Sequence, residues 1–227
     1  MSVIEIKNLY KIYDGSEVEV RAVNGINLNI EEGEFTAIVG PSGSGKTTFL
    51  NLVGGLDKPT DGKVFVDGID VWSLKSRKLI DFRLHNIGFV FQSYNLIPVL
   101  TAKENVEFIM QLQGWSRKDR IKRTGDLLKA VGLADRMDSR PAKLSGGQQQ
   151  RVAVARALAS KPKFVLADEP TANLDSKSTE NLLDIMEKLN QEEKITFIFS
   201  THDARVIKKA RRVITIEDGR ILKDETK

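Results

Sequence analysis

The sequence contains no cysteine, and this absence excludes disulfide bonds and thiolate metal sites from the forces that hold the fold together. It has only two histidines, His85 and His202, which are too few for a histidine-rich metal centre. No apolar run approaches the roughly 20 residues that a membrane-spanning helix requires. Residues 1–7 also lack the basic start and the continuous apolar stretch of a signal peptide. These absences predict a cytoplasmic protein that reaches a membrane only through a partner.

The charged residues form no large block of one sign. The chain has 35 basic and 31 acidic residues, mixed along its length, and a net charge of +4. The densest basic stretch, residues 118–123, has a spacing that is typical of the solvated face of a helix. We therefore expect no nucleic acid among the partners.

The order of hydrophobic patterns predicts a β-rich start, an α/β core, a helical insertion and a resumed α/β core. Alternating segments at 3–8, 18–23 and 26–30, with turn residues at Asp14-Gly15 and Asn24-Gly25, predict an antiparallel sheet with hairpin turns. Further strands are expected at 35–39, 63–66, 87–91, 164–167 and 195–199, and a final hairpin at 213–216 and 220–223 around Asp218-Gly219. Helices are expected at 47–53, within 101–132 after a Thr101–Glu104 capping box, and from near Ser145.

Residues 40–47 fit the phosphate-binding pattern G-x-x-x-x-G-K-[ST]. Its glycines let backbone N–H groups turn inward around phosphates, and the helix that follows adds its positive end. We expect Lys46 to reach the β- and γ-phosphates and the Thr47 hydroxyl to ligate Mg²⁺. The strand before the loop and the helix after it favour nucleotide binding over a chance glycine-rich turn. The residues expected to contact the nucleotide are Gly40, Ser42, Gly43, Ser44, Gly45, Lys46, Thr47 and Thr48.

Two carboxylates end the apolar strand at 164–167. They lie where α/β sheets bind ligands, at the carboxyl end of a strand. Asp168 is expected to hold Mg²⁺, directly or through water, and Glu169 to face the γ-phosphate and polarise the attacking water as a general base. An acidic pair on the surface is the alternative interpretation, and the phosphate-binding loop in the same chain argues against it.

The segment 144–151, Leu-Ser-Gly-Gly-Gln-Gln-Gln-Arg, predicts a second anion-binding helix start. Ser145 and the two glycines after it would present a hydroxyl and backbone N–H groups at the positive end of a helix. An isolated match of this kind would indicate only the start of a helix.

Together, residues 40–47, 144–148, Asp168, Glu169 and His202 resemble the ABC ATPase family, in the family's order and at its spacing. The resemblance covers essentially the whole chain, and the segment 144–148 is highly specific. It implies ATP hydrolysis with ATP and Mg²⁺ as cofactors, by two subunits that pair head to tail. Each ATP would lie between the phosphate loop of one subunit and the second helix start of the other, formed by Ser145, Gly146, Gly147 and Gln148. The implied partner is a second copy of this chain.

The resemblance assigns four further positions. Gln92 matches a glutamine that contacts Mg²⁺ and links the site to the helical insertion, so that the implied metal residues are Thr47, Gln92 and Asp168. His202 matches a histidine that hydrogen-bonds the γ-phosphate, Asp175 a loop that crosses between subunits, and Tyr13 an aromatic residue that stacks on adenine. The implied catalytic set is Lys46, Gln92, Glu169 and His202.

The implied fold class is α/β: a P-loop NTPase (RecA-like) core with an N-terminal antiparallel β subdomain and an inserted α-helical subdomain. The whole chain, 1–227, would be one ABC ATPase domain. Within it, residues 1–92 and 160–227 would form the nucleotide-binding core with the β subdomain. Residues 93–159 would form the helical subdomain with the signature segment.

The kind of ABC protein follows from lengths and from a finer resemblance. The insertion between Gln92 and Ser145 has no room for a long coiled coil, and the chain ends soon after Ile221, without a regulatory domain. Segments 87–98, 144–151 and 168–175 resemble the lipoprotein-releasing and macrolide-exporting ATPases. That subfamily implies an integral membrane permease as a second partner, on the inner face of the cell membrane. A cell-division-type ATPase, which transmits force without solute transport, is the alternative.

Two other classes of protein remain as rivals at this point. A P-loop kinase would need an acceptor pocket or lid, and it would leave residues 145–148 without a purpose. A silent nucleotide-binding adaptor would bind ATP without turnover. The transported substrate stays open, as does pairing with a related second subunit in place of a second copy.

Overall fold

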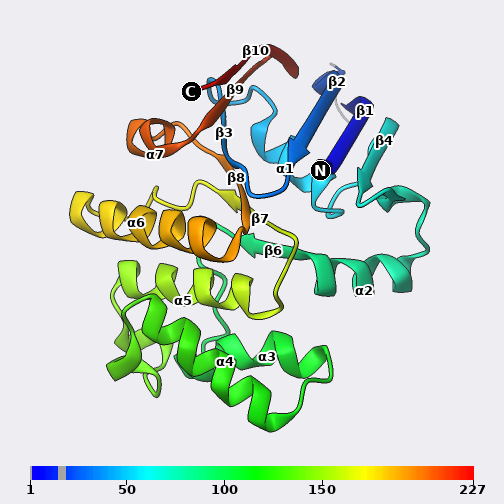
Figure 1. Ribbon diagram of the computed structural model, residues 1–227. Coiled ribbons are helices and arrows are strands. Elements are labelled where there is room, and N and C mark those ends of the chain that lie inside the picture. Colours follow the sequence, from blue (N-terminus) through cyan, green and yellow to red (C-terminus); the bar gives the residue numbers. More distant parts are fainter. Residues whose placement is uncertain (1, 15–18) are drawn as a thin grey trace.

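The computed structural model describes residues 2–14 and 19–227 (Figure 1). The elements in chain order are β1 (Ser2–Tyr13), β2 (Val20–Glu31), β3 (Phe35–Val39), α1 (Lys46–Val53), β4 (Asp61–Val66), β5 (Ile69–Asp70), α2 (Ser76–Asn86), β6 (Ile87–Val90), α3 (Ala102–Leu112), α4 (Arg117–Ala130), α5 (Gly146–Ala159), β7 (Phe164–Asp168), α6 (Ser176–Glu193), β8 (Thr196–Ser200), α7 (Ala204–Lys209), β9 (Arg212–Glu217) and β10 (Arg220–Thr226). Short 3-10 turns occur at Val71–Ser73, Ala134–Arg136 and Pro141–Lys143. No helix in the described ranges combines the length and the apolarity needed to cross a membrane.

A six-stranded sheet in the order β10-β9-β3-β8-β7-β6 forms the centre of the molecule. All of its pairings are parallel except β10 with β9. The strands β3, β6, β7 and β8 confirm the buried parallel strands that the short apolar runs predict. The β9–β10 hairpin is also confirmed, and its turn residues Asp218 and Gly219 both have positive φ, +46° and +71°.

Successive side chains of the central strands enter two different hydrophobic cores. In β7, Val165 and Ala167 pack with α5, α6 and the helices below them, whereas Phe164 and Leu166 pack with α1 and the antiparallel sheet. A strand that is buried on both faces needs apolar residues at every position, which explains why its sequence runs apolar without alternation. Figure 1 shows the two layers on opposite sides of the sheet, α3–α5 on one and β1, β2 and β4 on the other.

The second sheet is antiparallel, in the order β2-β1-β4-β5, and it corrects one prediction. The segments 18–23 and 26–30 are not two strands joined by a turn, because β2 runs without a break from Val20 to Glu31; residue 18 lies outside the described residues. Gly25, at φ +75°, is a bulge where the register with β1 shifts between Leu9 and Tyr10. The positive φ of Gly25 favours glycine at this bulge without any reversal of the chain. Gly15, of the other predicted turn, lies outside the described residues.

The helices α3, α4 and α5 pack on one another below the sheet (Figure 1). The Thr101 capping box is confirmed, with the Glu104 N–H 3.3 Å from Thr101 Oγ1 and the Thr101 N–H 2.7 Å from Glu104 Oε2. Gly132 follows α4 at φ +69°, which fits the predicted end of that helix. Ser145 caps α5, so this helix begins where the sequence predicts.

The elements α2, α6, α7 and β5 were not predicted. In α2 the single buried residue is Phe82, so its sequence carries no apolar stripe. Helix α7 is only six residues long. By contrast, α6 buries Leu182, Leu183, Met186 and Leu189 at helical spacing after an Asp175 cap, and this signal was available in the sequence.

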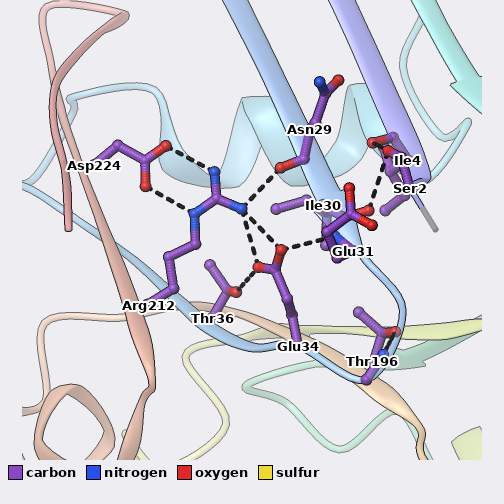
Figure 2. Close-up of polar contacts among 11 residues, drawn as sticks. Ser2, Ile4, Asn29, Ile30, Glu31, Glu34, Thr36, Thr196, Arg212 and Asp224 are labelled. Atoms are coloured by element: carbon purple, nitrogen blue, oxygen red, sulfur yellow. Dashed lines mark hydrogen bonds and ion pairs between the residues drawn. The ribbon is translucent and has the colours of Figure 1, made fainter. Parts of the chain in front are cut away.

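A charged network joins the two sheets near the chain's end. Figure 2 shows Arg212 of β9 between two carboxylates. Its Nε and Nη2 each donate to Asp224 of β10 over 2.7 Å, and its Nη1 donates to Glu34 over 2.8 Å and to the Asn29 carbonyl of β2 over 2.8 Å. Glu34 also accepts from the Thr36 hydroxyl at 2.6 Å. The hydrogen bonds that Arg212 donates to Asp224 contribute most to raising the pKa of the Arg212 guanidinium, and the charge of Glu34 raises it further.

We predict that Arg212→Met lowers the free energy of unfolding by about 2–3 kcal/mol, because it leaves two carboxylates without their cation. The side chain of Glu34 is only 16% exposed, so solvent cannot replace the lost partner. Arg21→Met is the matched control, since Arg21 pairs with Glu19 in a largely exposed bridge and should change stability by less than about 0.5 kcal/mol. Urea denaturation measures both variants. Equal losses would contradict a stabilising role for the Arg212 network.

Candidate functional site

The loop 40–47 leads from β3 into α1 and is packed tightly on its outer side. A Cβ at Gly40 would lie 2.0 Å from the Ile216 carbonyl oxygen, and one at Gly45 would lie 2.0 Å from that of Ala22. Both glycines also have positive φ, +151° and +99°. Around Gly43, at φ +79°, a Cβ would meet nothing within 4 Å. The loop is therefore closed toward β2 and β9 and open on its inner face.

Lys46 begins α1 and turns back over this loop. Its Nζ donates to the Gly40 carbonyl at 2.9 Å and to the Pro41 carbonyl at 2.8 Å. The Ser44 hydroxyl is buried and has no hydrogen-bond partner in the described part of the chain. A cationic tip, an unpaired hydroxyl and a helix start that faces an open loop are the groups that bind a phosphate chain.

Thr47 and Asp168 meet at the carboxyl edge of the sheet. Thr47 Oγ1 lies 3.0 Å and 3.1 Å from the two carboxylate oxygens of Asp168. No cluster of three or more His, Cys, Asp or Glu side chains occurs among the described residues. A hydroxyl beside one carboxylate supplies the hard oxygen donors that Mg²⁺ prefers, and Mg²⁺ commonly takes its other ligands from phosphates and water. The residues present therefore fit Mg²⁺ bound together with a nucleotide.

Glu169 directly follows β7, and its side chain faces that of His202, which follows the neighbouring strand β8. Glu169 Oε1 lies 2.7 Å from His202 Nδ1, and Glu169 Oε2 accepts from the Thr201 hydroxyl at 3.3 Å. The Glu169 side chain is 17% exposed, whereas that of His202 is 77% exposed. Glu169 has φ +43°, a backbone conformation that is strained for a glutamate and that occurs often in functional sites.

One cavity of about 720 Å³ gathers most of the predicted residues. Its lining includes Tyr13, Gly40, Ser42, Gly43, Gly45, Lys46, Thr47, Thr48, Gln92, Glu169 and His202. Ser44 lies buried behind the loop, and Asp168 lies behind Thr47. Residues far apart in the sequence thus face one space with the size of a ligand pocket.

Tyr13 forms the outer wall of this cavity at the end of β1. Its hydroxyl donates to Asp57 Oδ2 at 2.6 Å, and Lys11 Nζ lies 4.7 Å from the centre of its ring. Partial burial, followed by the bond to Asp57, raises the pKa of Tyr13. Tyr13 is 42% exposed and lines the cavity, so part of its side chain is accessible to a planar base. Asp57 was not predicted, because nothing in its local sequence indicates that it pairs with Tyr13.

The residues of the second helix start lie outside the cavity. Ser145 Oγ accepts from the Gln148 N–H at 3.3 Å, and Gln148 Oε1 accepts from the Ser145 N–H at 2.9 Å. The two glycines allow close approach, since a Cβ at Gly146 would lie 2.8 Å from the Tyr94 hydroxyl and one at Gly147 would lie 2.9 Å from Ser178 Oγ. The helix start that the sequence predicts to bind an anion is thus closed by a capping box at the start of α5.

Asp175 also lies outside the cavity, as the N-cap of α6. Its carboxylate accepts from the Ser178 N–H at 2.9 Å and the Ser178 hydroxyl at 2.6 Å. The Ser178 hydroxyl contributes most to lowering the pKa of Asp175, followed by the Ser178 backbone N–H. Two residues earlier, Asn173 Nδ2 donates to the Gln92 carbonyl at 3.0 Å. The segment before α6 therefore holds the backbone at Gln92.

A cluster around Asp203 was not predicted. The Arg205 guanidinium binds this carboxylate through two donors, at 2.9 Å and 2.7 Å, and Thr171 Oγ1 donates to it at 2.9 Å. These bonds, with Arg205 first, lower the pKa of Asp203 to about 2. Asp203 thus ties the turn that carries His202 to the loop after Glu169. A carboxylate two residues before an arginine at a helix start was the available signal.

Comparison with known proteins identifies the family. A family model described as "ABC transporter" matches residues 23–172. An uncharacterized ABC transporter ATP-binding protein of Thermotoga maritima is 50% identical over 219 residues, which cover 96% of this chain and 93% of that protein. The macrolide export ATP-binding/permease protein MacB of Rhodopirellula baltica is 47% identical over 223 residues, which cover 97% of this chain and 33% of MacB.

A solved structure agrees over nearly the whole length. The dimeric post-hydrolysis state of the ATP-binding cassette MJ0796, bound to ADP and Pi, matches with a TM-score of 0.90 at 45% identity and covers 98% of both chains. MJ0796 comes from Methanocaldococcus jannaschii. This agreement confirms the predicted fold class. Since the family model also spans the phosphate loop and the second helix start, the chain belongs to the ABC transporter family, as one of its ATP-binding cassettes.

Proposed function

We propose that two copies of this ABC ATPase pair head to tail and share two ATP sites. One observation carries the proposal: Ser145 and Gly147 lie outside the cavity that holds Lys46, so the two phosphate-binding helix starts of one chain do not face one space. A second copy supplies the missing half of each site. The MJ0796 cassette, whose solved structures are described as dimeric, supports this arrangement.

Within each site the residues divide the work. Lys46 binds the β- and γ-phosphates, while Thr47, Asp168 and Gln92 hold Mg²⁺, which neutralises phosphate charge when bound. Glu169 accepts a proton from the attacking water, and the 2.7 Å contact with His202 orients its carboxylate. His202 is exposed enough to reach the γ-phosphate. Tyr13 stacks on the adenine.

The partner subunit closes the site. Ser145 and Gly147 of one copy bind the γ-phosphate held by the other, and Asp175 lies in the segment that crosses between them. Hydrolysis removes the γ-phosphate contacts on both sides, and the dimer opens. In this scheme residues 93–159 move as a helical subdomain against a core formed by residues 1–92 and 160–227.

The second partner in the proposal is an integral membrane permease, with the ATPase at the inner face of the membrane. An apolar groove of about 450 Å³ lies between α2, β6, α3 and α5 and suits a short helix of that permease. Ile80 and Phe108 line it and are 58% and 38% exposed. Because MacB joins an ATP-binding part to a permease in one chain, we place this cassette with a permease of the macrolide-export or lipoprotein-release type.

We predict that Glu169→Gln lowers the ATPase rate by about 100-fold or more, because the water loses its base. The variant should still bind ATP and should accumulate as a dimer, seen by gel filtration at saturating ATP. Glu192→Gln, an exposed change on α6, is the control that should keep the wild-type rate. A Glu169→Gln protein that stays monomeric with ATP would show that this residue is not the base.

A mixing experiment tests the shared sites. Ser145→Arg and Lys46→Ala should each be inactive alone, and the wild-type rate should rise faster than linearly with protein concentration. In a 1:1 mixture half of the dimers are mixed, and each has one intact site. About one quarter of the wild-type rate should return if the two sites act independently. A linear wild-type rate with an active Ser145→Arg would sink the proposal and favour a monomeric enzyme.

A further inference from the structure

Arg156 of α5 is a half-buried cation that binds backbone carbonyls only. Its Nη2 donates to the Tyr94 carbonyl at 2.9 Å, and its Nη1 donates to the Asn95 carbonyl. Among the described residues no carboxylate pairs with it, although arginines of this depth usually have one. Burial lowers the pKa of the guanidinium. The Arg156 guanidinium therefore makes its hydrogen bonds to one short loop, at Tyr94 and Asn95.

That loop has a backbone conformation that needs support. Tyr94 and Asn95 have φ of +55° and +49°, so two successive residues other than glycine are left-handed. Such a conformation costs about 1–2 kcal/mol per residue and persists only where its surroundings hold it. The two carbonyls that Arg156 binds belong to these two residues. Arg156 is thus the side chain that stabilises the strained pair.

The strained pair lies close to Gln92 along the chain and contacts Gly146 of the second helix start. Gln92, which lines the ATP cavity, lies two positions before Tyr94. On the other side, the Tyr94 hydroxyl approaches Gly146 so closely that a Cβ there would lie 2.8 Å away. A change in the loop therefore moves the glutamine of one site and the helix start that serves the other.

The same loop forms part of the apolar groove. Asn95 and Arg156 line it together with Phe91 and Ile97. A helix that enters the groove must contact the loop or the arginine beneath it. A helix bound in the groove would therefore affect the positions of Gln92 and Gly146 through the loop at Tyr94 and Asn95.

We propose that Arg156 is a positioning residue for ATP hydrolysis: its guanidinium holds Tyr94 and Asn95 in the conformation that places Gln92 in one ATP site and supports Gly146 in the other. It makes no contact with nucleotide. This inference rests on the shared-site function proposed above and names the side chain through which groove and sites communicate.

Arg156→Met tests the proposal, because methionine fills similar volume without leaving a charge buried. The affinity of the monomer for Mg·ATP should stay within about twofold of wild type, since the phosphate loop is untouched, whereas kcat should fall at least about tenfold. In a Glu169→Gln background the ATP-dependent dimer should be lost from gel filtration. Arg156→Lys, which keeps the charge and can reach one carbonyl, should recover part of kcat.

Arg120→Met is the matched control. Arg120 is also half-buried and donates to a carbonyl, that of Trp115 at 2.7 Å, but it lies on α4 away from the loop. It should lose as much thermal stability as Arg156→Met while keeping kcat and dimer formation. A structural role alone for Arg156 would make the two variants alike in every measurement, and this result would overturn the proposal.

Asn95→Pro provides a second test that leaves Arg156 in place, should Arg156→Met fail to fold. Proline cannot adopt φ +49°, so the loop must leave its conformation, and the same loss of kcat with unchanged Mg·ATP affinity is expected. Full activity in Asn95→Pro would overturn the proposal. Dimer formation separates the two ideas. If Glu169→Gln alone forms no ATP-dependent dimer, the shared sites are refuted. If Glu169→Gln still forms a normal dimer when combined with Arg156→Met and when combined with Asn95→Pro, only the role of Arg156 is refuted.

Discussion

The site depends on the parallel pairing of β3, β8 and β7. In this pairing Ile38 aligns with Ser200, and Ser200 aligns with Asp168, so the three strands end at one edge of the sheet. Thr47 and Asp168 are separated by 121 positions in the sequence and still lie 3.0 Å apart, because each follows or ends a strand at that edge. A slip of register by one residue would move a carboxylate to the opposite face of the sheet. Hydrogen bonding between backbones thus positions the polar groups of the candidate site.

Two apolar cores hold this edge from opposite sides. One core joins the sheet to α3–α6, and the other joins it to α1 and the antiparallel sheet. The residues of the candidate site are divided between the same two sides of the sheet. The wall formed by Tyr13 belongs to the β-rich side, whereas Ser145 and Tyr94 belong to the helical side. The phosphate loop and the helix start on α5 are therefore held by different cores.

Local signals predicted much of this molecule, and long-range pairings limited the rest. The loop 40–47, the Thr101 capping box and the strand before Asp168 each carry their structure within a few neighbouring residues, and all three form as expected. The Asn24-Gly25 turn was wrong because a glycine bulge and a glycine turn have the same sequence signal. Arg156 and Arg212 were missed since their partners lie far away in the sequence, whereas Asp203 was missed although its partner Arg205 lies only two residues away. The roles assigned to the individual site residues, from Tyr13 and Lys46 to Glu169 and His202, stay predictions.

The packing of the phosphate loop has a consequence for the entropic cost of binding a nucleotide. Because Gly40 and Gly45 press against the carbonyls of Ile216 and Ala22, the loop has its shape before any nucleotide arrives. Binding then requires no ordering of the chain at this position, and its entropic cost stays low.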